Sequence, residues 1–98
     1  KVNYPSEYPD MTRAESLAIA SQAAGRTGII CSGGGTLPPE EFLTRLWEQM
    51  NTGKCRGAAT GRNIHQKDTE SAVKMTAACH AIICQGASVE EALKIYQS

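Results

Sequence analysis

The chain has 98 residues, of which 41% are hydrophobic and 20% charged, and its ten basic side chains balance ten acidic ones. This composition is typical of a small globular domain and excludes an intrinsically disordered segment. No apolar run approaches the roughly 18 residues that a spanning helix needs, and no basic stretch indicates a nucleic-acid or anionic-membrane surface. Because the sequence also shows no signal peptide, we expect a cytoplasmic protein without nucleic-acid or membrane partners.

The first part of the chain predicts a strand followed by a helix. Residues 1–4 have the alternation of a strand end, which Pro5 terminates. Thr12 and Glu15 form a capping box, and apolar residues at helical spacing then continue to Gly25. These signals predict a helix of about 12 residues.

The middle of the chain repeats this order. Residues 27–32 form an apolar run, β-branched at its centre and followed by three glycines, which predicts a strand buried on both faces. Pro38 and Pro39 suit the first turn of a helix that continues to Gly53. One apolar stripe along this helix indicates a core-facing surface, made of Phe42, Leu43, Leu46, Trp47 and Met50.

The last part predicts one more strand and more helices. Residues 56–60 are a weaker strand prediction, and a short helical stretch is expected at 63–66. Asp68 can cap a long helix that ends at Gly86, and Ser88 begins a last helix. The inward face predicted for the long helix consists of Ala72, Val73, Thr76, Ala77, His80 and Ile83, with His80 as a satisfied core histidine. The inward positions predicted for the last helix are Val89, Ala92, Leu93 and Tyr96.

The cysteines predict no metal site. Cys31, Cys55, Cys79 and Cys84 have neither the C-x-x-C spacing nor the histidine pairing of zinc sites. Since cysteine behaves as a small hydrophobic residue in reducing compartments, we expect free and mostly buried thiols. A redox or metal role is the alternative.

Strands and helices alternate along the chain, which is typical of βαβ units around a parallel sheet. A sheet of three parallel strands would leave long apolar edges unpaired. A TIM barrel of about 250 residues would contain these units as its last third. We therefore predict an α/β fold in which residues 1–98 form the C-terminal part of a TIM barrel.

Two glycine-containing turns follow neighbouring predicted strands, at the strand ends where parallel α/β proteins carry their chemistry. Ser32, Gly33 and Gly34 follow one strand, and Gly61 and Arg62 follow the next. Successive amides in such a turn can bind an anion, and a guanidinium matches two phosphate oxygens. Together the turns predict a phosphate site, whereas either one taken singly is better explained as an ordinary turn.

Lys1 lies on the first predicted strand. A lysine that is partly desolvated inside a barrel loses its proton more easily and can form a Schiff base with a ketone. From spacing alone, however, a solvated lysine at a chain terminus is the favoured interpretation.

Three motifs resemble those of one enzyme family. Residues 1–4 read KVNY, residues 32–35 read SGGG and are followed by LPPEEFL at 37–43, and residues 61–66 read GRNIHQ. Together they resemble class I aldolases of the DhnA/DeoC type, a family that includes archaeal-type fructose-1,6-bisphosphate aldolases and the Lsr autoinducer-2 aldolase/thiolase enzymes. The resemblance extends over essentially the whole chain and implies a (βα)8 barrel, of which residues 1–98 run from strand six to helix eight.

The resemblance also implies a function. Lys1 would be the Schiff-base nucleophile, and the phosphate contacts would be Ser32, Gly33, Gly34, Gly61 and Arg62. The implied activity is that of a lyase that cleaves or forms a C–C bond in a phosphorylated ketose such as fructose 1,6-bisphosphate. It needs neither metal nor cofactor, and the family implies a homo-oligomer. The family's proton-transfer residues lie on strands outside this chain.

Two other functions stay open. The first keeps the imine and changes the reaction to acyl transfer or a transaldol step on a phosphorylated diketone or sugar. The second is a non-catalytic phosphate-binding fragment with an inert Lys1.

Overall fold

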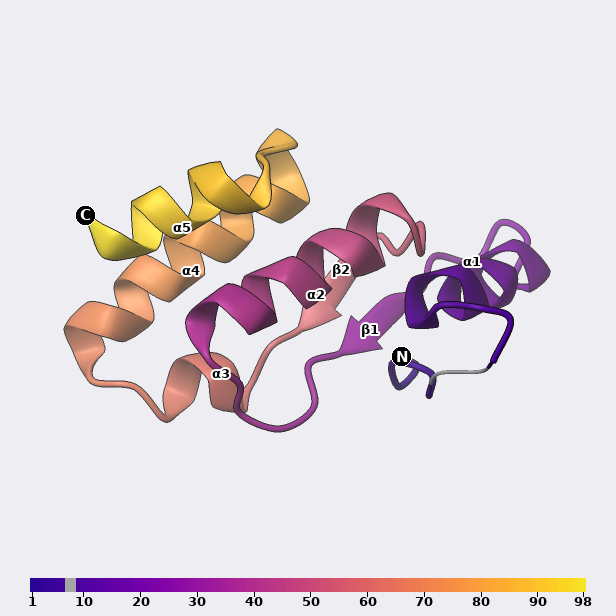
Figure 1. Ribbon diagram of the computed structural model, residues 1–98, viewed down its shortest axis with the longest axis horizontal. Coiled ribbons are helices and arrows are strands. Elements are labelled where there is room, and N and C mark those ends of the chain that lie inside the picture. The colour runs from indigo at the N-terminus through magenta and orange to yellow at the C-terminus, as the bar shows by residue number, and fades with distance from the viewer. Residues whose placement is uncertain (7–8) are drawn as a thin grey trace.

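The computed structural model describes residues 1–6 and 9–98, so Glu7 and Tyr8 of the opening stretch lie outside the described residues. Helices and strands alternate over most of this length (Figure 1). The elements are α1 (Arg13–Ala23), β1 (Ile30–Ser32), α2 (Pro39–Asn51), β2 (Gly57–Ala59), α3 (Arg62–His65), α4 (Thr69–Gln85) and α5 (Val89–Gln97). The predicted order of elements is confirmed from α1 onward, and β1 and β2 are both shorter than predicted.

The strands are parallel and follow one another in chain order. β1 pairs with β2 in a register that places Cys31 beside Ala58. Val2 forms an isolated parallel bridge with Cys31, in which its N–H donates to Ile30 and its carbonyl accepts from Ser32. The strand predicted at residues 1–4 is thus present only as this bridge.

One face of the sheet is covered by helices. Cys31 is fully buried in a cluster with Leu17 of α1, and Ala58 packs against the cluster built from α2, α4 and α5. Because paired residues of neighbouring strands point to the same face, α1 and α2 cover the same side of the sheet. Such a single helical layer on consecutive parallel strands is the arrangement found on the outside of a barrel.

The main hydrophobic core lies among the helices rather than in the sheet. Figure 1 shows α5 beside α4, with α2 between this pair and the strands. The buried members of this core are Phe42, Leu43, Leu46, Met75, Ala78, Cys79, Ile82 and Ala92. The apolar stripe predicted for α2 is therefore confirmed as core.

The helix ends follow the capping signals of the sequence. Thr12 and Ser88 each form the reciprocal capping box with a glutamate three residues later. The carboxylate of Asp68 accepts from the N–H of Ser71 at the start of α4, and Gly86 ends that helix in the left-handed conformation. These local hydrogen bonds explain why the helix ends could be predicted.

The prediction that residues 27–32 form a strand buried on both faces is wrong. Cys31 is buried, whereas Ile30 on the opposite face is 40% exposed. Its side chain faces away from the helical layer, and no other layer of the described chain covers that side.

The prediction of which face of α4 is buried is also wrong. Met75, Ala78 and Ile82 face the core, whereas Val73 is 63% exposed and His80 is exposed. α4 carries apolar residues on two sides, and only one side contacts α2 and α5. His80 is therefore not a core histidine in this structure. All four cysteines are free, and three are buried, as predicted.

Within the described residues, no helix has the length and apolar character required to cross a membrane.

Candidate functional site

The turn after β1 is held against the end of β2 by its backbone. The N–H of Gly33 donates to the carbonyl of Ala59 at 2.6 Å. A Cβ atom on Gly33 would lie 2.6 Å from that same oxygen, so only glycine fits there. Gly34 has a φ of +69°, in the left-handed region that favours glycine. The first two glycines of the turn are therefore required by its shape.

Two polar side chains from the α3 segment hold the rest of the turn. Asn63 is only 1% exposed; its Oδ1 accepts from the N–H of Leu37 at 2.9 Å, and its Nδ2 donates to the carbonyl of Gly35 at 3.1 Å. The hydroxyl of Thr36 donates to Gln66. The two glycine-containing turns thus form one hydrogen-bonded unit, although nearly thirty residues separate them in the sequence.

The unit leaves backbone donors unused. Among the described residues, the amides of Gly34, Gly35 and Thr36 have no hydrogen-bond partner, and neither do those of Gly61 and Arg62. The side chain of Arg62 is exposed and forms no ion pair with any described residue. Amides and a guanidinium at one strand edge can together bind a phosphate group.

Lys1 directly precedes Val2, whose bridge to Cys31 lies next to this edge. Val2 is paired with Cys31, which faces the helical layer, and side chains alternate along a strand. Lys1 therefore points to the opposite face, the one that Ile30 and Ser32 share. This face is not covered by helices, and Lys1 is exposed. In a closed barrel it would be the interior.

Tyr4 links the segment that carries Lys1 to the helical layer. Its hydroxyl donates to Oε2 of Glu48 at 2.9 Å, and the guanidinium of Arg13 lies 6.0 Å from its ring centre. Burial and the bond to Glu48 raise the pKa of the phenol well above its usual value of 10.0. Tyr4 therefore stays protonated near neutral pH and acts as a structural tie.

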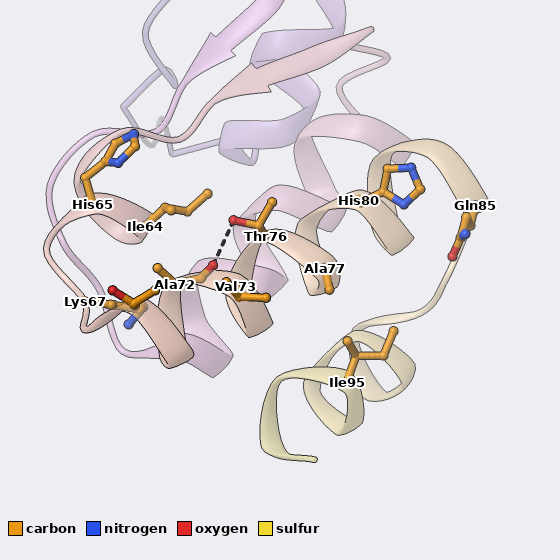
Figure 2. A pocket seen from close by; sticks show the side chains of 11 residues that line it. Ile64, His65, Lys67, Ala72, Val73, Thr76, Ala77, His80, Gln85 and Ile95 are labelled. Atoms are coloured by element: carbon orange, nitrogen blue, oxygen red, sulfur yellow. Dashed lines mark hydrogen bonds between the residues drawn. The ribbon is translucent and has the colours of Figure 1, made fainter.

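A small cavity lies beside the glycine turn. It has a volume of about 200 Å³ and is lined by Ser32, the three glycines that follow it, and side chains that include Asn3, Arg13 and Arg45. A second hollow, of about 910 Å³, lies along α3, α4 and α5 (Figure 2). Its wall is mostly apolar, including Ile64, Val73 and Ile95, and the hydroxyl of Thr76 that faces it bonds back to the carbonyl of Ala72. Its polar lining residues, which include His65, Lys67 and His80, lie apart from one another around the hollow (Figure 2), so the hollow has the character of an uncovered packing surface.

Among the described residues, neither the buried cysteines nor any cluster of metal-binding side chains indicates a second functional site. Burial raises the pKa of Cys31 and of Cys79 to about 11, so both stay as neutral thiols. No group of three or more histidine, cysteine, aspartate or glutamate side chains among residues 1–6 and 9–98 is placed to hold a metal ion.

The structure brings most of the predicted site residues together. Ser32, Gly33 and Gly34 lie at the end of β1 beside Gly61 and Arg62 at the end of β2, with Lys1 on the neighbouring strand. The analysis of the sequence assigned no role to Asn63. An asparagine directly after a glycine-arginine turn was the available signal, but its partners are distant in sequence.

The comparisons with known proteins point to one family. The chain is 53% identical over 97 residues to the fructose-bisphosphate aldolase/6-deoxy-5-ketofructose 1-phosphate synthase of Methanocaldococcus jannaschii, covering 98% of this chain and 30% of the relative. It is 33% identical over 87 residues to the fructose-bisphosphate aldolase class 1 of Halobacterium salinarum, covering 89% of this chain and 31% of that protein. No family model matches the chain.

A solved structure agrees with these relatives. The fructose-bisphosphate aldolase from Slackia heliotrinireducens matches with a TM-score of 0.93 and 45% identity, covering 97% of this chain and 30% of that one. The chain therefore spans about 30% of the length of the proteins it matches. Along nearly its whole length, the chain is similar to one section of these fructose-bisphosphate aldolases.

Proposed function

We propose that this chain is the section from strand six to helix eight of a (βα)8 barrel, and that the whole protein is a class I aldolase acting on a phosphorylated ketose such as fructose 1,6-bisphosphate. The observation that carries the proposal is the hydrogen-bonded unit of two glycine-containing turns beside the strand of Lys1. The names of the relatives suggest the reaction, and the hydrogen-bonded unit offers free N–H donors that could bind the phosphate.

The surfaces left uncovered support the barrel. Ile30 and Val73 are exposed apolar residues, and α4 presents a second apolar side along the larger hollow. A helix that is apolar on opposite sides is normally covered on both. The remaining strands and helices of a barrel would cover these residues and pair the free edge of β2.

Lys1 would carry the chemistry. On the inner face of the barrel, its neutral amine would attack the ketone carbonyl and release water to form an iminium. The electrons of the breaking C–C bond would flow into the iminium, giving an enamine on Lys1 and releasing an aldehyde. Protonation of the enamine and hydrolysis would then free the ketone product and restore Lys1.

The amides of the glycine turn and Arg62 would hold the phosphate. Fixing the phosphate places the carbonyl at a set distance from the strand of Lys1, which replaces a bimolecular encounter by an intramolecular one. Residues outside this chain would supply the proton transfers. A homo-oligomeric state and a cytoplasmic location remain predictions of the same proposal.

One relative carries a second activity in its name, 6-deoxy-5-ketofructose 1-phosphate synthase. A transaldol reaction on the same imine is therefore the second candidate function. The two activities share the nucleophile and the phosphate site, and they differ in the acceptor.

The test is borohydride trapping on the full-length protein that contains this chain. With dihydroxyacetone phosphate and borohydride, we expect one reduced adduct, which peptide mapping places on Lys1. Lys1→Met should abolish the adduct, and the exposed Lys54→Met should leave it unchanged. An unmodified Lys1 in a protein that still binds the phosphate ester would contradict the aldolase and leave the phosphate-binding function.

A further inference from the structure

We propose that Asn63 is a positioning residue that aims the backbone donors of the glycine turn at the substrate phosphate. This inference rests on the proposed function, because it assigns a role to Asn63 only if the turn binds phosphate. Neither the pattern of the sequence nor the names of the relatives assign that role.

The hydrogen bonds of Asn63 fix its orientation. The Leu37 N–H can only donate and the Gly35 carbonyl can only accept, so Oδ1 must face the first and Nδ2 the second. With the side chain 1% exposed, water is no substitute for either partner. The amide of Asn63 therefore holds the turn at both Gly35 and Leu37.

These bonds determine where the next amide points. In a trans peptide, the carbonyl of Gly35 and the N–H of Thr36 point in opposite directions within one plane. Because the carbonyl is directed at buried Asn63, the Thr36 N–H is directed away from it. Among the described residues this N–H has no partner, so it adds a third donor to the amides of Gly34 and Gly35.

An aliphatic residue at position 63 would fill the space without this effect. The Leu37 N–H and the Gly35 carbonyl would lose their partners, and the Gly35–Thr36 peptide would be free to rotate. Thr36 and Gln66 share only one hydrogen bond at the exposed side of the turn, which does not fix that peptide.

Asn63→Asp tests this arrangement with almost no change in size. The carboxylate can accept from the Leu37 N–H, but its second oxygen faces the Gly35 carbonyl and repels it. Protonation restores a donor at that position, and burial beside a carbonyl raises the pKa of the new carboxyl. We therefore expect inorganic phosphate to bind the full-length Asn63→Asp protein about tenfold more weakly at pH 8. At pH 5.5 the affinity should return to within about twofold of the unsubstituted protein.

The measurement is calorimetric titration with inorganic phosphate at both pH values. Inorganic phosphate itself changes charge in this range, and the segment around Asn63 also carries Arg62, His65 and Lys67. Each affinity is therefore divided by that of the unsubstituted protein at the same pH. Asn51→Asp is the matched control, since Asn51 also donates to a backbone carbonyl, that of Trp47, but at an exposed position at the end of α2. Borohydride trapping of dihydroxyacetone, which lacks a phosphate, should proceed at an unchanged rate in both variants.

The outcomes separate the two proposals. If the unsubstituted protein does not bind phosphate, the proposed phosphate site fails and the role of Asn63 fails with it. If phosphate binds equally to the unsubstituted and Asn63→Asp proteins at both pH values, only the role of Asn63 is overturned. A loss of affinity at both pH values, together with slower trapping of dihydroxyacetone, would show that Asn63 supports the fold and would also overturn that role.

Discussion

The strand-end edge and the helical core of this chain are stabilised in different ways. At the edge, residues 32–37 and 60–66 are held by backbone hydrogen bonds, two glycines and one buried asparagine. In the core, α2, α4 and α5 are held by apolar side chains, of which Leu43, Met75 and Ala92 are fully buried. Polar contacts fix directions and apolar contacts supply most of the folding free energy. We therefore expect substitutions to separate stability from phosphate binding.

The largest stability effect should come from the core. Leu43→Ala leaves a cavity at a position with 0% exposure, which should lower the free energy of unfolding by about 2–5 kcal/mol. Phosphate affinity of the folded full-length protein should not change. Urea unfolding and phosphate calorimetry measure the two quantities, with the exposed Lys94→Ala as control, expected within about 0.5 kcal/mol. A loss of phosphate affinity in Leu43→Ala would show that core and edge are coupled.

Gly33→Ala should affect both properties. Its Cβ would meet the Ala59 carbonyl oxygen at 2.6 Å, and the backbone there cannot move aside without breaking the β1–β2 pairing. We expect a loss of about 1–3 kcal/mol in stability, with weaker phosphate binding. Gly35→Ala is the matched control for stability, because a Cβ on Gly35 meets nothing within 4 Å and its φ is not left-handed. Equal effects of the two substitutions would contradict the close backbone approach.

Tyr4→Phe should have a smaller effect at the junction of the two regions. It removes the hydroxyl that donates to Glu48, a half-buried bond to a charged acceptor, at a cost of about 1 kcal/mol. Thermal unfolding of the full-length protein measures the change. Glu48→Gln keeps a hydrogen-bond acceptor, so it should lower the free energy of unfolding less than Tyr4→Phe does. The reverse order would indicate that the charge of Glu48 stabilises the fold through an interaction other than the one with Tyr4.

The smallest effect should be a difference in pH dependence. Hydrogen bonds from Ser71 lower the pKa of Asp68 below its ordinary value of 3.8 in the folded chain. This cap therefore contributes its full stability above about pH 4, and the contribution is lost as the pH falls through the lowered pKa. Asp68→Asn keeps the capping oxygen and removes the titration, so its stability should fall slightly less than that of the unsubstituted protein between pH 4 and pH 2. The free energy of unfolding is measured with urea between pH 4 and pH 2 for both proteins. An equal decrease in the two proteins would contradict a contribution from the charged Asp68 cap.

Local signals account for the parts of the fold that could be predicted. Thr12, Asp68 and Ser88 begin helices through hydrogen bonds that span three residues, and the motif at 32–35 follows a short apolar strand. The buried side of α4 could not be chosen in this way, because Met75 and Val73 lie on different sides of a helix that is apolar on both. Which side is buried depends on the partner helices, and spacing within one helix does not reveal them.

The site divides along the same line. The glycines and Arg62 could be named as candidates from the sequence because their expected chemistry depends on residue type and on the strand ends beside them. Asn63 could not, since its role depends on contacts with Gly35 and Leu37, which are 28 and 26 residues away. Only the pairing of β1 with β2 brings these residues together.

The chain order of the strands has a consequence for assembly. Each strand pairs with the one before it, so every pairing closes a loop of a single strand-helix unit, at a modest and similar entropic cost. A chain with such short-range pairings can add its units one after another as it leaves the ribosome. The glycine turn reaches its final shape only when β2 and Asn63 arrive. Under the proposed function, the phosphate site would therefore form only after the units before Asn63 have docked.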